Sequence, residues 1–247
     1  MSIIEIQNDI SSRKITRLCH FVHTNKLLHI LNSSEGIKAV DYIDEDVLEQ
    51  NDKARYDGKT NYVNCSIQYP NYWYFRKVKD NNPIFKDWAI IFIDPIVMTW
   101  NTTMFCPVNA AKNRGKYIMK GYEGFKKIYQ DRLSFSRCPD RTPKMLSNAP
   151  TDDQAEVLVF QNIPRKYILG IALDSEENAK LKQAEWKLLQ DVPQFDIYIA
   201  PELFTEATSR KVRNGEAPLE IKYEEAGLND DASKNKVYRS DVRSCNW

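Results

Sequence analysis

One short apolar run constrains this chain more than any other feature. The run Trp88-Ala-Ile-Ile-Phe-Ile is rich in β-branched and aromatic residues and is stopped by Asp94 and Pro95. Such a run is typical of a strand that is buried on both faces. It is also far shorter than the roughly 20 apolar residues of a membrane-spanning helix, and no other run approaches that length. We therefore expect an interior strand and no membrane partner.

Other segments carry the patterns of strands and helices. The expected strands cover residues 18–22, 62–67, 155–160, 166–173 and 195–200. The expected helices cover residues 25–31, 112–132 and 175–190, the last with Ser175 as its N-cap. Residues 71–76 predict an aromatic turn, residues 44–55 a charged helix or loop, and residues 134–153 a long loop. Because these elements lack a regular βαβ rhythm, we expect an α+β fold.

Chain length and cysteine usage limit the class of protein. The 247 residues contain no linker rich in Gly, Pro or Ser, so we expect one domain over residues 1–247, with residues 205–247 as its last part or as a C-terminal extension. Five cysteines without a CxxC pair argue against a disulfide framework and a cysteine-rich zinc site. With no secretory signal at the N-terminus, they predict a cytoplasmic protein. His20 and His23 face opposite sides of a strand, so we expect no metal.

The charge is unevenly distributed along the chain. Residues 112–149 carry ten basic side chains and three acidic ones, a net charge of +7. Residues 150–235 carry ten basic and 17 acidic side chains, a net charge of −7. A local excess of this kind is typical of a surface that binds a polyanion such as nucleic acid, although a solvated charged helix gives the same pattern.

A carboxylate follows the long loop at the start of an apolar strand. Gln154 and Glu156 are two residues apart, so on an extended chain both side chains project to one face. An amide beside a carboxylate can hold a polar substrate and accept its proton, or stabilise positive charge on a breaking glycosidic bond. An exposed pair at a strand start is the alternative interpretation. No phosphate-binding glycine loop, metalloprotease motif or serine-hydrolase motif accompanies it.

Four stretches in order resemble the DarT family of nucleic-acid ADP-ribosyltransferases. The resemblance covers most of residues 15–175. It is carried by Ile15–Leu31, similar to that family's NAD-binding histidine motif; by Lys53–Arg55 before Tyr62–Ile67; by Phe105–Ala111; and by Asp153–Val159 with the strand around Tyr167–Leu173. The resemblance implies an ADP-ribosyltransferase-like fold, with two packed central sheets flanked by helices. It also implies NAD as the co-substrate.

The resemblance assigns roles to named residues. Glu156 is expected to be the catalytic carboxylate, and Arg55 to contact the NAD phosphates or the developing charge. His20 and Asn109 are expected to bind NAD, and Gln154 to contact the acceptor base. Arg141 and Lys144, in the basic block, are expected to contact the backbone of a single strand, with aromatic side chains stacking on bases. The aromatic cluster at residues 72–75 is expected to be either such a platform or core.

Departures from the family's pattern bear on the acceptor. Residue 22 is Val where a hydroxyl residue is frequent, and Tyr62–Ile67 reads Tyr-Val-Asn-Cys-Ser-Ile where the thymidine-modifying branch has Tyr-Val-Pro-Phe-Tyr-Phe. We therefore favour guanine over thymine in single-stranded DNA. The resemblance further implies a toxin of a toxin–antitoxin or anti-phage system, with an antitoxin protein as partner. RNA-base modification, a protein acceptor, plain NAD hydrolysis and non-catalytic nucleic-acid binding are the alternatives.

Overall fold

The computed structural model of the protein describes residues 2–43, 57–81, 87–188 and 195–224. The helices in these ranges are α1 (Ser2–Arg13), α2 (Thr24–Asn32), α3 (Tyr72–Asn81), α4 (Gly121–Ile128), α5 (Glu176–Lys187) and α6 (Ala207–Arg213). The strands are β1 (Leu18–His23), β2 (Ile37–Lys38), β3 (Tyr62–Ile67), β4 (Trp88–Ile93), β5 (Met104–Cys106), β6 (Met119–Lys120), β7 (Glu156–Phe160), β8 (Asn162–Ile163), β9 (Ile168–Leu173), β10 (Asp196–Ile199) and β11 (Ile221–Lys222). Among these helices none is long and apolar enough to cross a membrane.

Nine of these strands form one mixed sheet in the order β11-β10-β9-β4-β1-β3-β7-β5-β6, and β2 pairs with β8 apart from it. Within the described residues only β9 and β10 pair in parallel. Every residue of β4 is buried, as its apolar sequence predicts, and β4 lies between β1 and β9. The α+β class is therefore confirmed.

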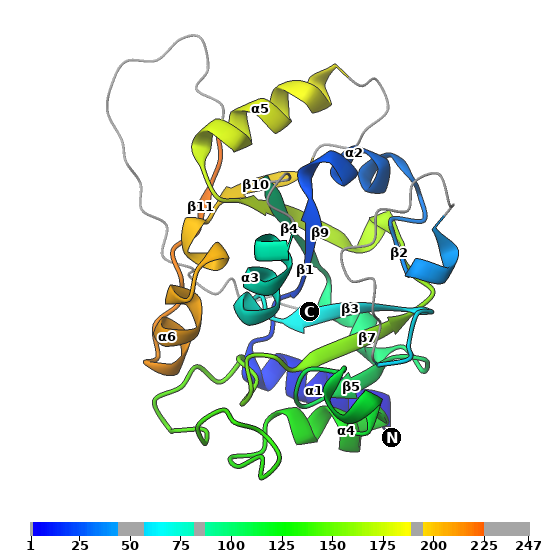
Figure 1. Ribbon diagram of the computed structural model, residues 1–247, viewed down its shortest axis with the longest axis vertical. Helices are drawn as coiled ribbons and strands as arrows, with labels where there is room; N and C mark the ends of the chain where they lie inside the picture. The colour runs from blue at the N-terminus through cyan, green and yellow to red at the C-terminus, as the bar shows by residue number, and fades with distance from the viewer. Residues whose placement is uncertain (1, 44–56, 82–86, 189–194, 225–247) are drawn as a thin grey trace.

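The sheet divides where β1 meets β3. The two strands pair only through Leu18↔Ile67 and Cys19↔Ser66, whereas β1 pairs with β4 along its whole length. In Figure 1, β1, β4 and β9 run side by side, and β3 and β7 cross their direction. The two expected central sheets are thus two halves of one sheet, joined at a single short ladder.

Helices cover both halves. Figure 1 shows α2 and α5 at one end of the molecule and α1 and α4 at the other, with α3 beside the junction of the halves. α1 packs against α4, and α4 packs against β5. The amphipathic helices α1 and α6 were not expected from the sequence.

The predicted aromatic turn at residues 71–76 is wrong, because these residues begin helix α3. The side chain of Asn71 accepts a hydrogen bond from the backbone N–H of Tyr74 (3.0 Å), and the backbone N–H of Asn71 donates to Ser66 Oγ (3.1 Å). Asn71 therefore acts as an N-cap, which satisfies a backbone donor of the first helical turn. A polar residue before an aromatic run is compatible with a turn or a cap, and the apolar core beneath α3 favours the helix.

The predicted helix over residues 112–132 is also largely wrong. Only Gly121–Ile128 is α-helical, and the chain before it turns through Asn113 and Arg114, whose φ angles are 50° and 55°. Left-handed conformations interrupt a right-handed helix. The other expected elements form with bounds shifted by a few residues, including the helix capped by Ser175. The charged helix or loop expected over residues 44–55 lies outside the described residues.

Residues 207–222 pack onto the rest of the molecule. β11 pairs with β10. The guanidinium of Arg17 donates from Nη1 to Glu220 (2.6 Å), pairs with the same carboxylate through Nη2, and lies over the ring of Phe92 at 3.8 Å. This ion pair, whose side chains are 11% and 19% exposed, joins the C-terminal segment to the start of β1.

We predict that Glu220→Ala lowers the free energy of unfolding by about 2 kcal/mol, because it leaves a mostly buried guanidinium without its carboxylate. Chemical denaturation monitored by circular dichroism measures the change. Glu216→Ala, which removes an exposed carboxylate from the same segment, is the matched control and should change stability by less than about 0.5 kcal/mol. Equal stability of the two variants would contradict the role of the ion pair.

Candidate functional site

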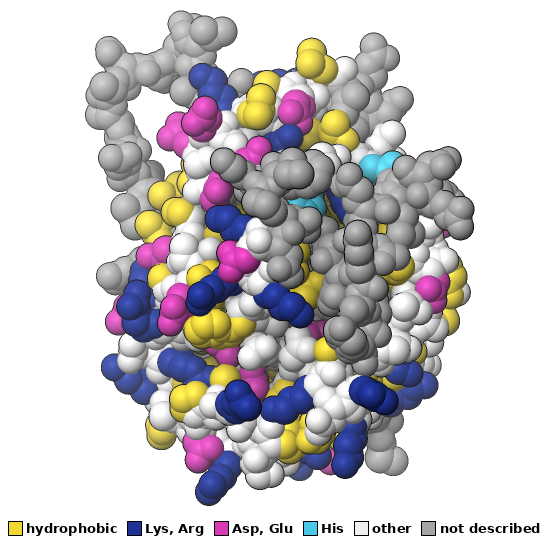
Figure 2. Space-filling view, in the orientation of Figure 1, with side chains coloured by type: hydrophobic (Ala, Val, Ile, Leu, Met, Phe, Trp, Pro, Cys, Tyr) yellow, Lys and Arg dark blue, Asp and Glu magenta, His cyan; other side chains and the backbone are white. Residues whose placement is uncertain are grey.

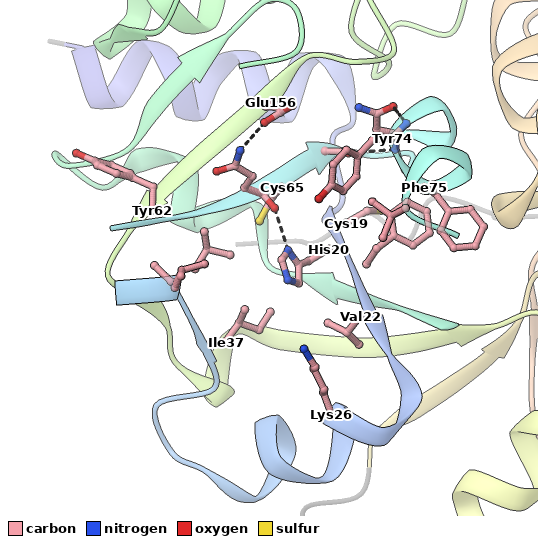
Figure 3. A pocket seen from close by; sticks show the side chains of 18 of the residues that line it. Cys19, His20, Val22, Lys26, Ile37, Tyr62, Cys65, Tyr74, Phe75 and Glu156 are labelled. Carbon is pink, nitrogen blue, oxygen red and sulfur yellow. Dashed lines mark hydrogen bonds between the residues drawn. The ribbon is translucent and has the colours of Figure 1, made fainter. Parts of the chain in front are cut away.

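A cavity of about 420 Å³ lies at the junction of the two halves of the sheet. Its walls come from β1, α2, β3, α3 and the start of β7, as Figure 3 shows for ten labelled side chains. Four of the residues singled out from the sequence line it, namely His20, Asn109, Gln154 and Glu156. The fold therefore brings together side chains that are up to 136 positions apart in the sequence.

The carboxylate of Glu156 is held from both sides. Glu156 is the first residue of β7, which lies between β3 and β5. Its Oε2 accepts a hydrogen bond from Asn64 Nδ2 on β3 (2.6 Å), and its Oε1 accepts from Asn109 Nδ2 (2.8 Å) and the backbone N–H of Ala110 (3.3 Å). Glu156 is 8% exposed. Three N–H donors stabilise the ionised carboxylate and fix its orientation, as a catalytic acceptor requires.

The amide of Asn64 also joins two carboxylates. Its Nδ2 donates to Asp57 Oδ2 at 3.3 Å as well as to Glu156, and Asp57 is buried. The Oδ1 of Asp57 accepts from the backbone N–H of Lys59 (3.2 Å). Asp57 thus fixes the direction in which the Asn64 amide points, and Asn64 in turn orients Glu156.

His20 occupies the place where the ladder between β1 and β3 ends. Its Nδ1 lies 2.9 Å from the backbone carbonyl oxygen of Asn64. A carbonyl oxygen only accepts, so Nδ1 carries the proton, and a neutral imidazole in this tautomer has an acceptor at Nε2. Asn64 therefore links the other two residues: its backbone carbonyl contacts His20, and its side-chain amide contacts Glu156. Dashed lines mark these two hydrogen bonds in Figure 3.

Gln154 directly follows the long loop and stands two residues before Glu156, the first residue of β7. Its backbone N–H donates to Asp152 Oδ1 (2.9 Å), and its side chain lines the cavity with that of Glu156. The two side chains share the cavity as the spacing predicts, although only Glu156 belongs to the strand.

Three further predicted residues remain, namely Arg55, Arg141 and Lys144. Arg55 is outside the described residues, so its role stays a prediction. Arg141 and Lys144 do not line the cavity. The guanidinium of Arg141 donates to the backbone carbonyls of Ala149 and Leu146, both at 2.7 Å, and so shapes the loop. Lys144 is exposed on that loop.

Sequence reasoning missed several residues of the cavity: Lys26, Lys38, Asp57, Asn64 and Lys77. Two of them carried a signal. Asn64 interrupts an otherwise apolar strand, where a polar side chain needs a partner. Lys26 stands on the first turn of a helix that the sequence did predict, and Figure 3 shows it extending into the cavity.

The buried thiols show no sign of nucleophilic activation. Burial raises the pKa of Cys19 and of Cys106 to about 12, and it raises the pKa of Cys65 still further. Burial, together with the carboxylates of Asp153 and Asp152, raises the pKa of Cys138 to about 12. A thiol reacts as its thiolate. Cys19 is therefore a buried thiol of the core.

The comparisons with known proteins agree with this geometry. A family model described as "ssDNA thymidine ADP-ribosyltransferase, DarT" matches residues 19–205. The structure of Thermus sp. 2.9 DarT in complex with NAD+ is similar with a TM-score of 0.57 and 13% identity, over 78% of this chain and 98% of that chain. That of Thermus sp. 2.9 DarT in complex with ADP-ribosylated ssDNA has a TM-score of 0.55 and 12% identity, over 78% and 97%. At these identities the structures show a shared fold. A search of curated proteins found no match.

We predict that the four described thiols react slowly with a thiol-specific reagent at pH 8. A pKa raised from 9.0 to about 12 lowers the thiolate fraction about 1,000-fold, and only pH values near that pKa would restore it. The measurement is colorimetric thiol titration of a Cys245→Ser variant, in the native state and in denaturant. Fast labelling of native Cys138, the least buried of the four, would contradict the prediction.

Proposed function

The chain belongs to the DarT family of NAD-dependent ADP-ribosyltransferases that act on single-stranded DNA, and we propose that it transfers ADP-ribose from NAD to guanine in a single strand. The observation that carries the proposal is the carboxylate of Glu156, fixed by three N–H donors in the wall of a cavity large enough for a nucleotide. A single strand is the expected substrate because pairing in a duplex hides the base edge.

The reaction breaks the bond between nicotinamide and ribose. Nicotinamide leaves with the bonding electrons, and positive charge develops on the ribose. The carboxylate of Glu156 stabilises this charge and holds a ribose hydroxyl. A base nitrogen then bonds to the anomeric carbon, and its proton moves to Glu156. Because Asn64 and Asn109 fix the carboxylate beforehand, it needs no rearrangement when charge develops.

The other end of the cavity suits NAD. His20, Lys26 and Lys38 line the same cavity, and we propose that His20 contacts a ribose hydroxyl and that the two lysines contact the pyrophosphate. Lys38 also pairs with the carboxylate of Glu35. We propose Arg55 as a further phosphate contact, on the family resemblance. Asn109 contributes to this site through Glu156, which it contacts directly.

The choice of guanine rests on two features. The segment Tyr62–Ile67 departs from the thymidine-modifying pattern at Asn64, and that side chain stands at the catalytic carboxylate. Gln154 presents an amide beside Glu156, and an amide reads a purine edge by paired hydrogen bonds. The description of the matching family names thymidine, so thymine is the competing acceptor.

A basic surface accompanies the cavity. The exposed basic side chains of the +7 block are Arg114, Lys116, Lys120, Lys126, Arg132, Arg137 and Lys144. Figure 2 shows Lys and Arg side chains over the lower part of the molecule, where Figure 1 places α4 and the loop after it. We propose that these cations, Lys144 among them, contact the phosphates of the strand. Arg141 supports the loop that carries Arg137 and Lys144.

An ADP-ribose unit on a base edge blocks base pairing and copying. We therefore propose a toxin that acts in the cytoplasm, where NAD and DNA meet, and an antitoxin protein that reverses the mark or covers the site. This role fits a toxin–antitoxin or anti-phage system.

We predict that Glu156→Gln lowers the rate of ADP-ribosyl transfer to single-stranded DNA by about 10²- to 10⁴-fold, because it removes the charge and the proton acceptor. The assay incubates the protein with NAD and oligonucleotides that contain one guanine or one thymine, and weighs the products by mass spectrometry. Expression of the variant should relieve toxicity to the host cell.

Matched oligonucleotides and a surface variant complete this test. Glu216→Gln controls for loss of charge, and thermal melting confirms that both variants fold. If only the oligonucleotide with thymine were modified, the acceptor would be thymine and not guanine. If only RNA were modified, the substrate would be RNA and not DNA. NAD consumption without a modified oligonucleotide would favour hydrolysis or a protein acceptor. Undiminished transfer by Glu156→Gln would refute the site, and intact binding and toxicity would favour a non-catalytic binding protein.

We predict that Asn64→Ala lowers kcat about 10- to 100-fold, since one charge-assisted hydrogen bond to the catalytic carboxylate is lost. The backbone carbonyl that His20 contacts is retained, so the KM for NAD should change less than kcat. Steady-state kinetics at varied NAD measures both. A rise in the KM for NAD with unchanged kcat would place Asn64 in NAD binding instead of carboxylate orientation.

A further inference from the structure

Helix α3 presents an exposed tryptophan at the cavity. Trp73 lines the cavity and is 37% exposed, whereas Phe75 on the same helix is 2% exposed and stacks on Phe21 with ring centroids 4.5 Å apart. The aromatic cluster thus divides into a core residue and a residue at the rim. An indole is large and apolar, and leaving one in contact with solvent beside a cavity provides a flat surface for another ring.

The indole of Trp73 is fixed in orientation. Its Nε1–H donates to Asp153 Oδ2 (3.1 Å). The same carboxylate accepts from Cys138 Sγ (3.1 Å) and from the hydroxyl of Ser209 on α6. Asp153 therefore ties helix α3 to the long loop and to the C-terminal segment. Cys138, Asp152 and Asp153 also have the spacing of metal ligands, and these hydrogen bonds account for the arrangement of the Asp153 carboxylate without an ion.

The hydrogen bond to Asp153 also places the indole of Trp73 near Gln154, whose amide is expected to contact the acceptor base. Gln154 follows Asp153 directly, and both Trp73 and Gln154 line the cavity. The loop is further held by Arg213 of α6, whose Nη2 donates to the carbonyl of Thr151 (2.9 Å). The indole and the backbone that carries Gln154 are thus both held by hydrogen bonds.

Lys77 adds a positive charge beside Trp73 and Gln154. Lys77 is four residues after Trp73, so the two side chains share one face of α3. Lys77 is exposed and also lines the cavity. An aromatic plane, an amide and a cation at one rim are the combination that binds a base and its phosphate in single-stranded nucleic acid.

We propose that Trp73 is the stacking platform for the acceptor base, with Gln154 contacting the base edge and Lys77 an adjacent phosphate. The proposal rests on the proposed function and extends it to a recognition site built by α3. On the proposed function, NAD would bind where His20, Lys26 and Lys38 line the same cavity. The hydrogen bond to Asp153 fixes the indole at the rim of the cavity.

The test separates binding from catalysis. In a Glu156→Gln background, binding of a fluorescently labelled single-stranded oligonucleotide is measured by anisotropy. Trp73→Ala should raise the Kd about 10- to 100-fold, and Trp73→Phe, which keeps a ring, should raise it less. Lys77→Ala should weaken binding and lower its salt dependence. Lys79→Ala is the matched control for the loss of a positive charge, because Lys79 is on the same helix but does not line the cavity. Trp100→Phe is the control for the loss of an indole, because Trp100 packs on Tyr167 away from the cavity.

In the active protein, Trp73→Ala should raise the KM for the oligonucleotide by a similar factor and leave the KM for NAD far less affected. An unchanged Kd, or an equal rise in the KM for NAD, would overturn the proposal. If the parent protein modified no oligonucleotide, the proposed function would fail. The ratio of Kd values would still decide whether Trp73 stacks on a base.

Discussion

The short ladder between β1 and β3 is the constraint on which the site depends. Two strands that pair at Leu18–Cys19 and then separate leave backbone groups without a partner strand, and buried backbone groups need partners. The ring of His20 satisfies one of these, the carbonyl of Asn64. The separation opens the cavity, and the same carbonyl contact fixes one of its walls. A fully paired sheet would have no room there for a nucleotide.

The carboxylate of Glu156, which we propose to be catalytic, is positioned by neighbouring segments on both sides of its strand. Glu156 stands first on β7, and the flanking asparagines, Asn64 and Asn109, reach it from β3 and from the turn after β5. Burying an ionised group without such partners is costly, so the two amides stabilise the fold and prepare the chemistry together. This double role explains why a polar Asn64 is tolerated in the middle of a buried strand.

The surroundings of Trp73, which we propose to bind the acceptor base, are built from segments that are far apart in the sequence. Asp153 receives hydrogen bonds from α3, from the long loop and from α6, which lies beyond the residues that the family model matches. The ion pair of Arg17 with Glu220 holds the end of that segment to β1. The C-terminal segment therefore contacts the loop that precedes Gln154.

Periodicity and composition by themselves determined the buried strands, the helix capped by Ser175, the long loop and the α+β class, because these depend on local patterns of apolar residues. The spacing of Gln154 and Glu156 likewise placed both in one site. Tertiary structure alone decided the rest. Asn71 became a helix cap over an apolar core, and the basic segment before Gly121 turned left-handed where a helix was expected. Contacts such as Asn64 with Glu156 join residues 92 positions apart, and no local pattern encodes such a distance.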